Sequence, residues 1–234
     1  MDYTTLGNTG LRVSVAGLGC GGNSRLGQSS GKSQSESVAI VRQALDHGVN
    51  FLDTAAAYGT EAIVGAAIKD RPRDQVVVAT KAQIRGDGQV LSPSDVVASL
   101  DRSLRALDTD HVDVFQLHGV RPDAYEPARD HLVPALLEEK AKGKFRFLGI
   151  TETGPHDPGH LMLQRAVEDD CWEVVMLAFH MMNQNAREVV FPQTRARQIG
   201  TLLMFVVRSI FSVSGRLQET MRARDRRRRV TAWS

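Results

Sequence analysis

Three apolar segments in the first half of the chain each end in an ionisable residue. The run VNFLD ends in Asp53, VVVATK ends in Lys81 and VDVFQLH ends in His118, while Tyr58 follows Asp53 by five residues. Parallel α/β proteins carry their catalytic residues at the carboxyl ends of strands. A carboxylate, an ammonium, a phenol and an imidazole gathered at one such end can hold and transfer protons. The spacing therefore predicts a site that carries chemistry at this end of the strands.

The periodicity of the three segments places their ionisable ends on a common face. Because side chains alternate along a strand, Asp53, Lys81 and His118 share that face with the residues at every second position before them. These inward-facing positions are Val49, Phe51, Val77, Ala79, Val112, Val114 and Gln116. The pattern predicts a mostly apolar inner row on each strand with one ionisable residue at its end.

Each of the four residues also has a structural interpretation. Asp53 and Lys81 can form a buried ion pair, and a lone histidine such as His118 is often a hydrogen-bonded core residue. Tyr58 stands before a glycine, where a tyrosine often only anchors a loop. All four groups in register favour the functional interpretation. A phenol far from both Lys81 and His118 would leave only the structural one.

Strand and helix signals alternate along the whole chain. An Asn8-Thr9-Gly10 turn predicts an N-terminal β-hairpin over residues 3–13. Seven strands are then expected near residues 15, 51, 78, 115, 148, 176 and 204. Helices are expected at residues 34–45, 61–69, 93–107, 132–142 and 161–167, and at 186–198 with an interruption at Pro192. This order indicates a parallel sheet covered by helices.

The predicted fold is an α/β barrel of the (β/α)8 TIM type that lacks its last βα unit. A closed barrel needs eight strands, and the pattern gives seven after the hairpin. No linker divides the chain before about residue 214, so residues 1–213 form one predicted barrel domain. Residues 214–234 are expected to be a basic tail, irregular or helical.

Composition excludes several classes of protein. The two cysteines give neither a disulfide framework nor a metal-ligand spacing, and the N-terminus has no signal-peptide pattern. No apolar run is long enough to cross a bilayer, so a cytoplasmic location is expected. Seven arginines between residues 216 and 229 carry the positive charge, and the rest of the chain is mildly acidic. This distribution argues against a nucleic-acid-binding domain.

Several motifs resemble the aldo-keto reductase family. They are LGNTGLRVS, GLGCGG, NFLDTAAAYG, VVATK, VDVFQLH and GKFRFLGIT, spread over residues 3–208. The resemblance implies that Tyr58 is the general acid that protonates a substrate carbonyl oxygen. It implies that Lys81 lowers the pKa of this phenol from its usual value of about 10 and that Asp53 orients Lys81. His118 would donate a hydrogen bond to the same oxygen.

The family uses a nicotinamide cofactor, which supplies the hydride that no side chain can provide. The resemblance implies NADP(H), with NAD(H) not excluded, bound across the carboxyl face of the barrel. The chain has no GxGxxG fingerprint after a strand. In the loop GCGGNSRLG, Gly21 and Gly22 would let the backbone approach a ligand closely.

Four further residues occupy cofactor positions by resemblance. Thr151 and Glu152 stand where the family has Ser-Asn at the carboxamide, and Glu152 would accept from the carboxamide NH2. Met176 stands where a glutamine is common and cannot replace its hydrogen bonds. Phe205 would stack on the nicotinamide. The family's pyrophosphate loop and the basic segment that binds the 2′-phosphate have no match.

Two functions follow from this pattern. The first is an NAD(P)-dependent oxidoreductase that transfers a hydride between a nicotinamide and an aldehyde, ketone or alcohol, with Tyr58 as general acid/base. The second is a catalytically silent, truncated homologue that serves as a binding module or remnant. Open barrel edges would favour self-association.

Overall fold

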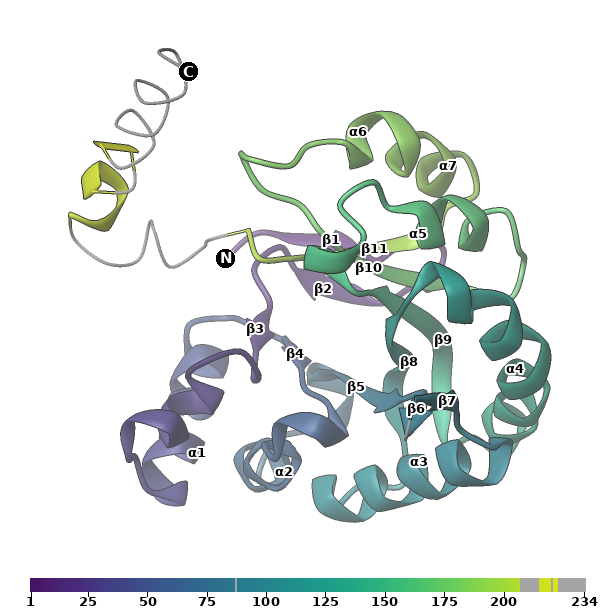
Figure 1. Cartoon of the computed structure of the whole chain (residues 1–234). Coiled ribbons are helices and arrows are strands. Elements are labelled where there is room, and N and C mark those ends of the chain that lie inside the picture. The colour runs from purple at the N-terminus through teal and green to yellow at the C-terminus, as the bar shows by residue number, and fades with distance from the viewer. Residues whose placement is uncertain (87, 207–214, 220, 223–234) are drawn as a thin grey trace.

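The fold was described from a computed structural model that places residues 1–86, 88–206, 215–219 and 221–222. The basic tail expected over residues 214–234 lies largely outside the described residues. Figure 1 shows a single sheet that curls around its own inner face, with helices along the outside. No helix of the described part has both the length and the apolar character needed to cross a membrane.

The central sheet contains seven parallel strands in the order β11-β10-β9-β8-β5-β4-β3. Their bounds are β3 Leu18–Gly19, β4 Phe51–Asp53, β5 Val77–Gln83, β8 Val112–Val120, β9 Phe145–Glu152, β10 Val174–Ala178 and β11 Gly200–Met204. Within the described residues β3 and β11 do not pair with each other, so the sheet is an incomplete barrel with two edges. The predicted fold class is confirmed.

Two small antiparallel ribbons accompany the sheet. The first joins β1 (Tyr3–Thr5) and β2 (Arg12–Ser14), and the second joins β6 (Arg85–Gly86) and β7 (Gln89–Val90). The first ribbon is the predicted hairpin, and its turn packs against the start of β11, where Asn8 N donates to Gln198 O at 2.7 Å. The second ribbon lies in a segment that the sequence pattern treats as a loop.

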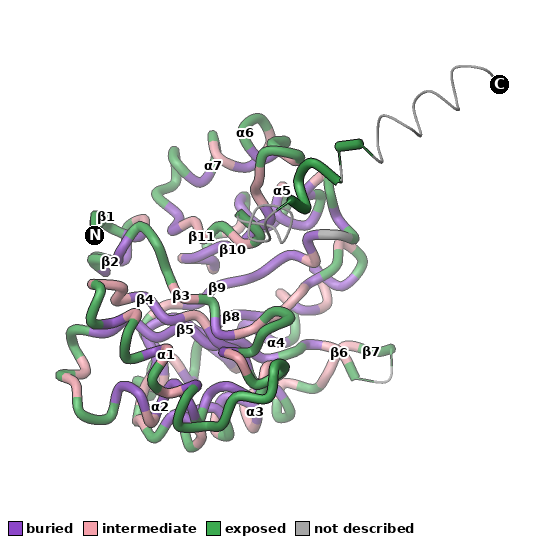
Figure 2. Tube along the Cα trace, turned by 90° about the vertical axis from the view of Figure 1, so that its left-hand side faces the viewer, coloured by how far each residue is buried: buried purple, intermediate pink, exposed green. Residues whose placement is uncertain are grey.

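The helices follow the strands as expected from the alternation. They are α1 Gln34–Asp46, α2 Glu61–Ile68, α3 Pro93–Leu107, α4 Tyr125–Ala141, α5 Leu161–Ala166, α6 Ala186–Val189 and α7 Phe191–Ala196. Short 3-10 turns are η1 Arg25–Ser30, η2 Ala56–Tyr58, η3 Arg73–Gln75, η4 Pro122–Ala124 and η5 Gly154–His156. Figure 2 shows the buried residues gathered on the strands and the exposed ones on the outer sides of the helices.

Local signals explain most helix boundaries. Ser33 forms the predicted capping box with Glu36 at the start of α1, and Ser92 accepts from Asp95 N at the start of α3. Pro192 follows the break between α6 and α7, as predicted. The start expected for α4 is wrong: the helix begins at Tyr125, because Pro127 lies in its first turn and Pro134 is accommodated inside it.

The first and last strands of the sheet also differ from the apolar segments that predict them, residues 13–18 and 201–207. Val13 belongs to the hairpin strand β2, and the first barrel strand is the two-residue β3. A bend at Val15 and Ala16 and one glycine, Gly17, separate the two, which the apolar pattern alone does not reveal. β11 ends at Met204, before the expected end at Val207, which lies outside the described residues.

The inner face of the sheet is a closed apolar cluster beneath the site. Phe51, Val77, Ala79 and Val114 pack there, as the alternation predicts. The hairpin region contributes Leu6, Leu11 and Val13 to the same cluster. The hairpin therefore fills the amino end of the half-barrel, and the inner rows lead up to the ionisable residues at the carboxyl end.

Candidate active site

An ion pair between β4 and β5 forms the base of the site. Lys81 Nζ lies 2.7 Å from both carboxylate oxygens of Asp53 and donates to the carbonyl oxygen of Thr54 at 2.8 Å. These bonds use all three ammonium hydrogens. The Lys81 side chain is 1% exposed and that of Asp53 is 14% exposed. The pair is thus fixed in orientation at the carboxyl end of two adjacent strands.

Tyr58 is held over this pair by the turn after β4. The residue ends η2, and Gly59 follows in the left-handed region at φ 70°. The Lys81 ammonium lies 5.2 Å from the centroid of the Tyr58 ring. The ring also rests on Gly21, where a Cβ atom would come within 2.5 Å of Tyr58 Cε2. Gly21 therefore makes room for the phenol, a role different from the predicted contact with cofactor.

His118 completes the group from β8. Its Nε2 lies 3.4 Å from the Tyr58 hydroxyl oxygen, and the two rings meet edge to face with centroids 5.4 Å apart. The four residues singled out by spacing thus meet at the carboxyl ends of β4, β5 and β8. The Tyr58 hydroxyl lies close to His118, so the large separation that would have left only the structural interpretation is not observed.

The electrostatics of the phenol differ from the expectation. Burial raises the pKa of Tyr58, and the nearby Asp53 carboxylate and Cys20 raise it further. The prediction that Lys81 lowers the pKa of Tyr58 is therefore wrong for this structure. Burial of the ring is the largest cause of this rise, and the Asp53 carboxylate beside Lys81 adds to it.

Burial also sets the pKa of the neighbouring groups. It lowers the pKa of His118 to about 4, with a smaller contribution from the Lys81 charge. It raises the pKa of Cys20 to about 12, with help from Asp53. Burial raises the pKa of Asp53 as well, and the Lys81 charge opposes that rise. At neutral pH the phenol is protonated, the imidazole is neutral and the thiol is not a nucleophile.

A buried polar layer supports the site from behind. The Thr80 hydroxyl donates to Glu61 Oε1 at 2.5 Å, and the hydroxyls of Thr54 and Thr60 lie 2.9 Å apart. These contacts tie the first turn of α2 to β5 and to the segment after β4. Sequence reasoning missed the threonines, because a threonine at a strand end carries no chemical signature.

Three of the residues expected to bind cofactor lie around the carboxyl end of the sheet. Thr151 lies at the end of β9, where its Oγ1 accepts from Gly119 N at 2.7 Å and keeps its own hydrogen to donate. Met176 pairs in register with Thr151 and is 6% exposed. Gly22 adopts φ 69° with open space around it. These residues lie on the strands and loops around the carboxyl end.

Glu152 and Phe205 depart from their expected environments in opposite ways. No part of the Glu152 side chain is exposed, and it bonds to His160 and to Ala178 N. The prediction that Glu152 contacts the carboxamide is therefore wrong. Phe205 follows β11 at φ 62° and is 46% exposed, with its ring against Gly154.

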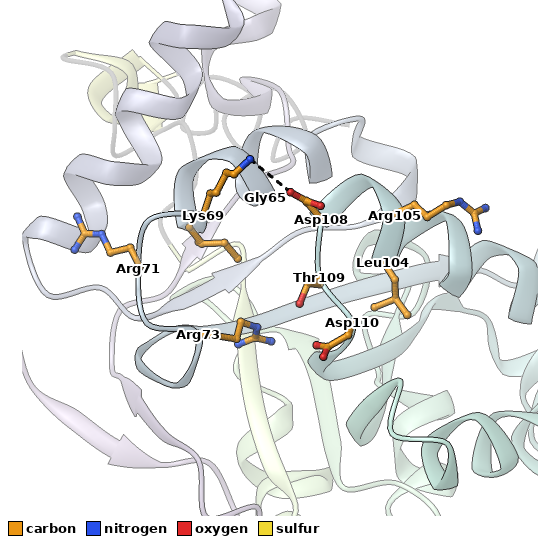
Figure 3. Close-up of a pocket in the computed structure, with 10 residues that line it drawn as sticks. Gly65, Lys69, Arg71, Arg73, Leu104, Arg105, Asp108, Thr109 and Asp110 are labelled. Atoms are coloured by element: carbon orange, nitrogen blue, oxygen red, sulfur yellow. Dashed lines mark ion pairs between the residues drawn. The ribbon is translucent and has the colours of Figure 1, made fainter.

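Figure 3 shows a different hollow, whose lining residues lie at the ends of α2 and α3 and in the segments that lead into β5 and β8. It has a volume of about 700 Å³ between the last turns of α2 and α3 and contains no member of the candidate site. Lys69 pairs with Asp108 across it at 4.0 Å. Its basic residues complement the negative ends of two helices, so we assign them a structural role.

No group of three or more histidine, cysteine or acidic residues in the described part of the chain could hold a metal ion.

Comparison with known proteins identifies the family. The model of the aldo/keto reductase family matches residues 17–232. The chain belongs to the aldo/keto reductase family. The resemblance seen in the motifs is thereby confirmed.

Relatives of this aldo/keto reductase include L-galactose dehydrogenase of Arabidopsis thaliana, 31% identical over 86% of this chain and 64% of the relative. Aldo-keto reductase YhdN of Bacillus subtilis is 31% identical over 87% of this chain and 61% of the relative. The holo form of aldo-keto reductase AKR11C1 from Bacillus halodurans superposes with a TM-score of 0.71 at 27% identity, covering 87% of this chain and 65% of that structure. The chain thus spans less than two thirds of these relatives' length.

Proposed function

We propose that the chain is an NADP(H)-dependent oxidoreductase that interconverts an aldehyde or ketone and its alcohol. The observation that carries this proposal is the meeting of Tyr58, His118 and the Asp53–Lys81 pair at one strand end. A phenol 3.4 Å from an imidazole leaves a site where both can reach the same carbonyl oxygen.

The structural features around β9 fit a nicotinamide. The hydroxyl of Thr151 can donate to a carboxamide oxygen, and the hydroxyl oxygen of Thr153 is buried without a partner. The half-exposed ring of Phe205 offers a stacking surface. When bound, the nicotinamide supplies the hydride to the carbonyl carbon.

The residues of the chain supply the proton. In the direction of reduction, Tyr58 donates its hydroxyl proton to the carbonyl oxygen, and the product is an alcohol. His118 is neutral and donates from Nε2 to the same oxygen, while its Nδ1 is buried without a partner. Lys81 faces the ring as the phenolate forms, and Asp53 keeps it in place. The phenol is protonated at neutral pH, as this direction requires.

A second candidate function is a catalytically silent homologue that acts as a binding module. In the described part of the chain β3 and β11 are edge strands that do not pair with each other, and this observation favours it. The two functions differ in one measurement, the consumption of NADPH with an aldehyde.

The test compares Tyr58→Phe with a matched Tyr3→Phe control. The Tyr3 hydroxyl donates to Gly48 O at 2.8 Å and belongs to the N-terminal hairpin. We expect Tyr58→Phe to lower kcat by about 10² to 10⁴-fold, since a positioned general acid contributes that much, with an unchanged Kd for NADPH. Tyr3→Phe should keep wild-type kcat. Full activity of Tyr58→Phe refutes the role of the phenol, and no turnover by the wild type supports the silent homologue.

A further inference from the structure

A fully buried carboxylate–imidazole pair lies behind the cofactor side of the site. Glu152 ends β9, and its Oε2 lies 2.7 Å from His160 Nδ1. Both side chains are 0% exposed. His160 adopts φ 58° just before α5, and its Nε2 is buried without a partner. The chemistry proposed above does not use this pair.

The position of Glu152 explains what the pair connects. The ladder between β9 and β10 ends where Thr151 pairs with Met176. Beyond that point the other carboxylate oxygen, Glu152 Oε1, accepts from the backbone amide of Ala178 at 2.8 Å. The side chain therefore continues the connection between the two strands after their backbones stop pairing.

Ala178 in turn contacts the segment that holds the proposed stacking ring. A Cβ atom added to Gly154 would lie 3.0 Å from Phe205 Cε2 and 3.4 Å from Ala178 Cβ. Ala178 also pairs in register with Met204, the residue before Phe205. A shift of Ala178 would thus move the surface on which the Phe205 ring rests.

We infer that Glu152 and His160 are positioning residues that fix the cofactor-facing ends of β9, β10 and β11. This inference rests on the proposed function and deepens it. Glu152 acts on Thr151 through the backbone of β9 and on Phe205 through Ala178. The pair has no contact with the reacting atoms, so its loss weakens the binding of cofactor and leaves the proton transfer at Tyr58 intact.

The test is a fluorescence titration of the full chain with NADPH, together with kcat at saturating NADPH and a thermal melt. We expect Glu152→Ala to raise Kd about tenfold, since it removes a hydrogen bond to a charged acceptor, with kcat within about twofold of wild type. Glu152→Gln keeps an oxygen for the Ala178 amide and should stay within about threefold in Kd.

Asp113 provides a matched control at the other end of the sheet. It is also a buried carboxylate that accepts from a neighbouring strand, with Val78 N at 2.9 Å, and it pairs with Arg73 and Arg146. Asp113→Ala should lower Tm at least as much as Glu152→Ala and leave the Kd for NADPH unchanged.

The outcomes separate the inference from the proposed function. An unchanged Kd in Glu152→Ala with a lowered Tm makes the pair merely structural and overturns the inference alone. If Glu152→Ala does not fold, His160→Ala is titrated instead, with a rise in Kd of at least about threefold expected and an unchanged Kd overturning the inference. A wild type that binds neither NADPH nor NADH overturns the proposed function and this inference with it.

Discussion

Replacing Gly21 by alanine tests how closely the Tyr58 phenol must be held for the proposed reaction. The added Cβ would lie 2.5, 2.6 and 2.7 Å from three carbon atoms of the Tyr58 ring, whereas ordinary contact begins at 3.4 Å. The ring must therefore retreat by about 0.9 Å from Gly21. A misplacement of about 1 Å can cost about a hundredfold in rate. We expect Gly21→Ala to lower kcat/KM for aldehyde reduction by that amount.

The assay is NADPH oxidation with a small aromatic aldehyde, and Gly19→Ala is the control. Gly19 lies two residues earlier, has no positive φ and has no atom within 4 Å of its added Cβ. This control should keep wild-type kinetics. A normal kcat/KM in Gly21→Ala would refute the idea that the ring rests on this glycine during turnover. A loss confined to the Kd for NADPH would instead support the direct cofactor contact expected from the sequence.

Two further predictions concern pH and association. Because the pKa of Tyr58 is raised and that of His118 is lowered to about 4, both groups keep one protonation state between about pH 5 and 9. The kcat/KM for reduction should be flat over that range. The kcat/KM for alcohol oxidation should rise with pH, because oxidation needs the phenolate. An inflection near pH 6.5 in the kcat/KM for reduction would contradict the burial of His118. At the open edge, Leu203 on β11 is 44% exposed, and Leu203→Lys should shift sedimentation of a self-associated wild type toward monomer, since an edge lysine opposes strand pairing. A wild type that is already a monodisperse monomer would refute the association.

The sequence predicts the group of Asp53, Tyr58, Lys81 and His118 because the alternation of side chains along a strand is strict. A period of two fixes Phe51 below Asp53 and Ala79 below Lys81, and the apolar cluster on the inner face has this composition. The capping box at Ser33 likewise depends on residues only three positions apart. Such signals depend on residues that are close along the chain, so they can be interpreted without knowledge of the fold.

The predictions from the sequence fail where a property depends on residues that are distant along the chain. The pKa of Tyr58 depends on how deeply its ring is buried and on the nearby Asp53 carboxylate, and both follow from contacts between separate elements. The error at Glu152 has another cause. Thr151 and Glu152 are neighbours on one strand, so their side chains cannot both face inward. Alternation alone therefore contradicts a cofactor role shared by Thr151 and Glu152. The contact between Glu152 and His160 is known only from the structure.

The order of the strands suggests which step an incomplete barrel affects. Asp53, Lys81 and His118 lie on β4, β5 and β8, and each of these strands is paired on both sides. Phe205 follows β11, which is an edge strand in the described part of the chain, and the connection from β11 back toward β9 includes the Glu152 side chain. The group of four residues is therefore supported independently of the open edge, while the proposed nicotinamide surface is not. From this we reason that the open edge weakens cofactor affinity before it weakens the proposed proton transfer, so measurements at low NADPH alone would understate the proposed activity.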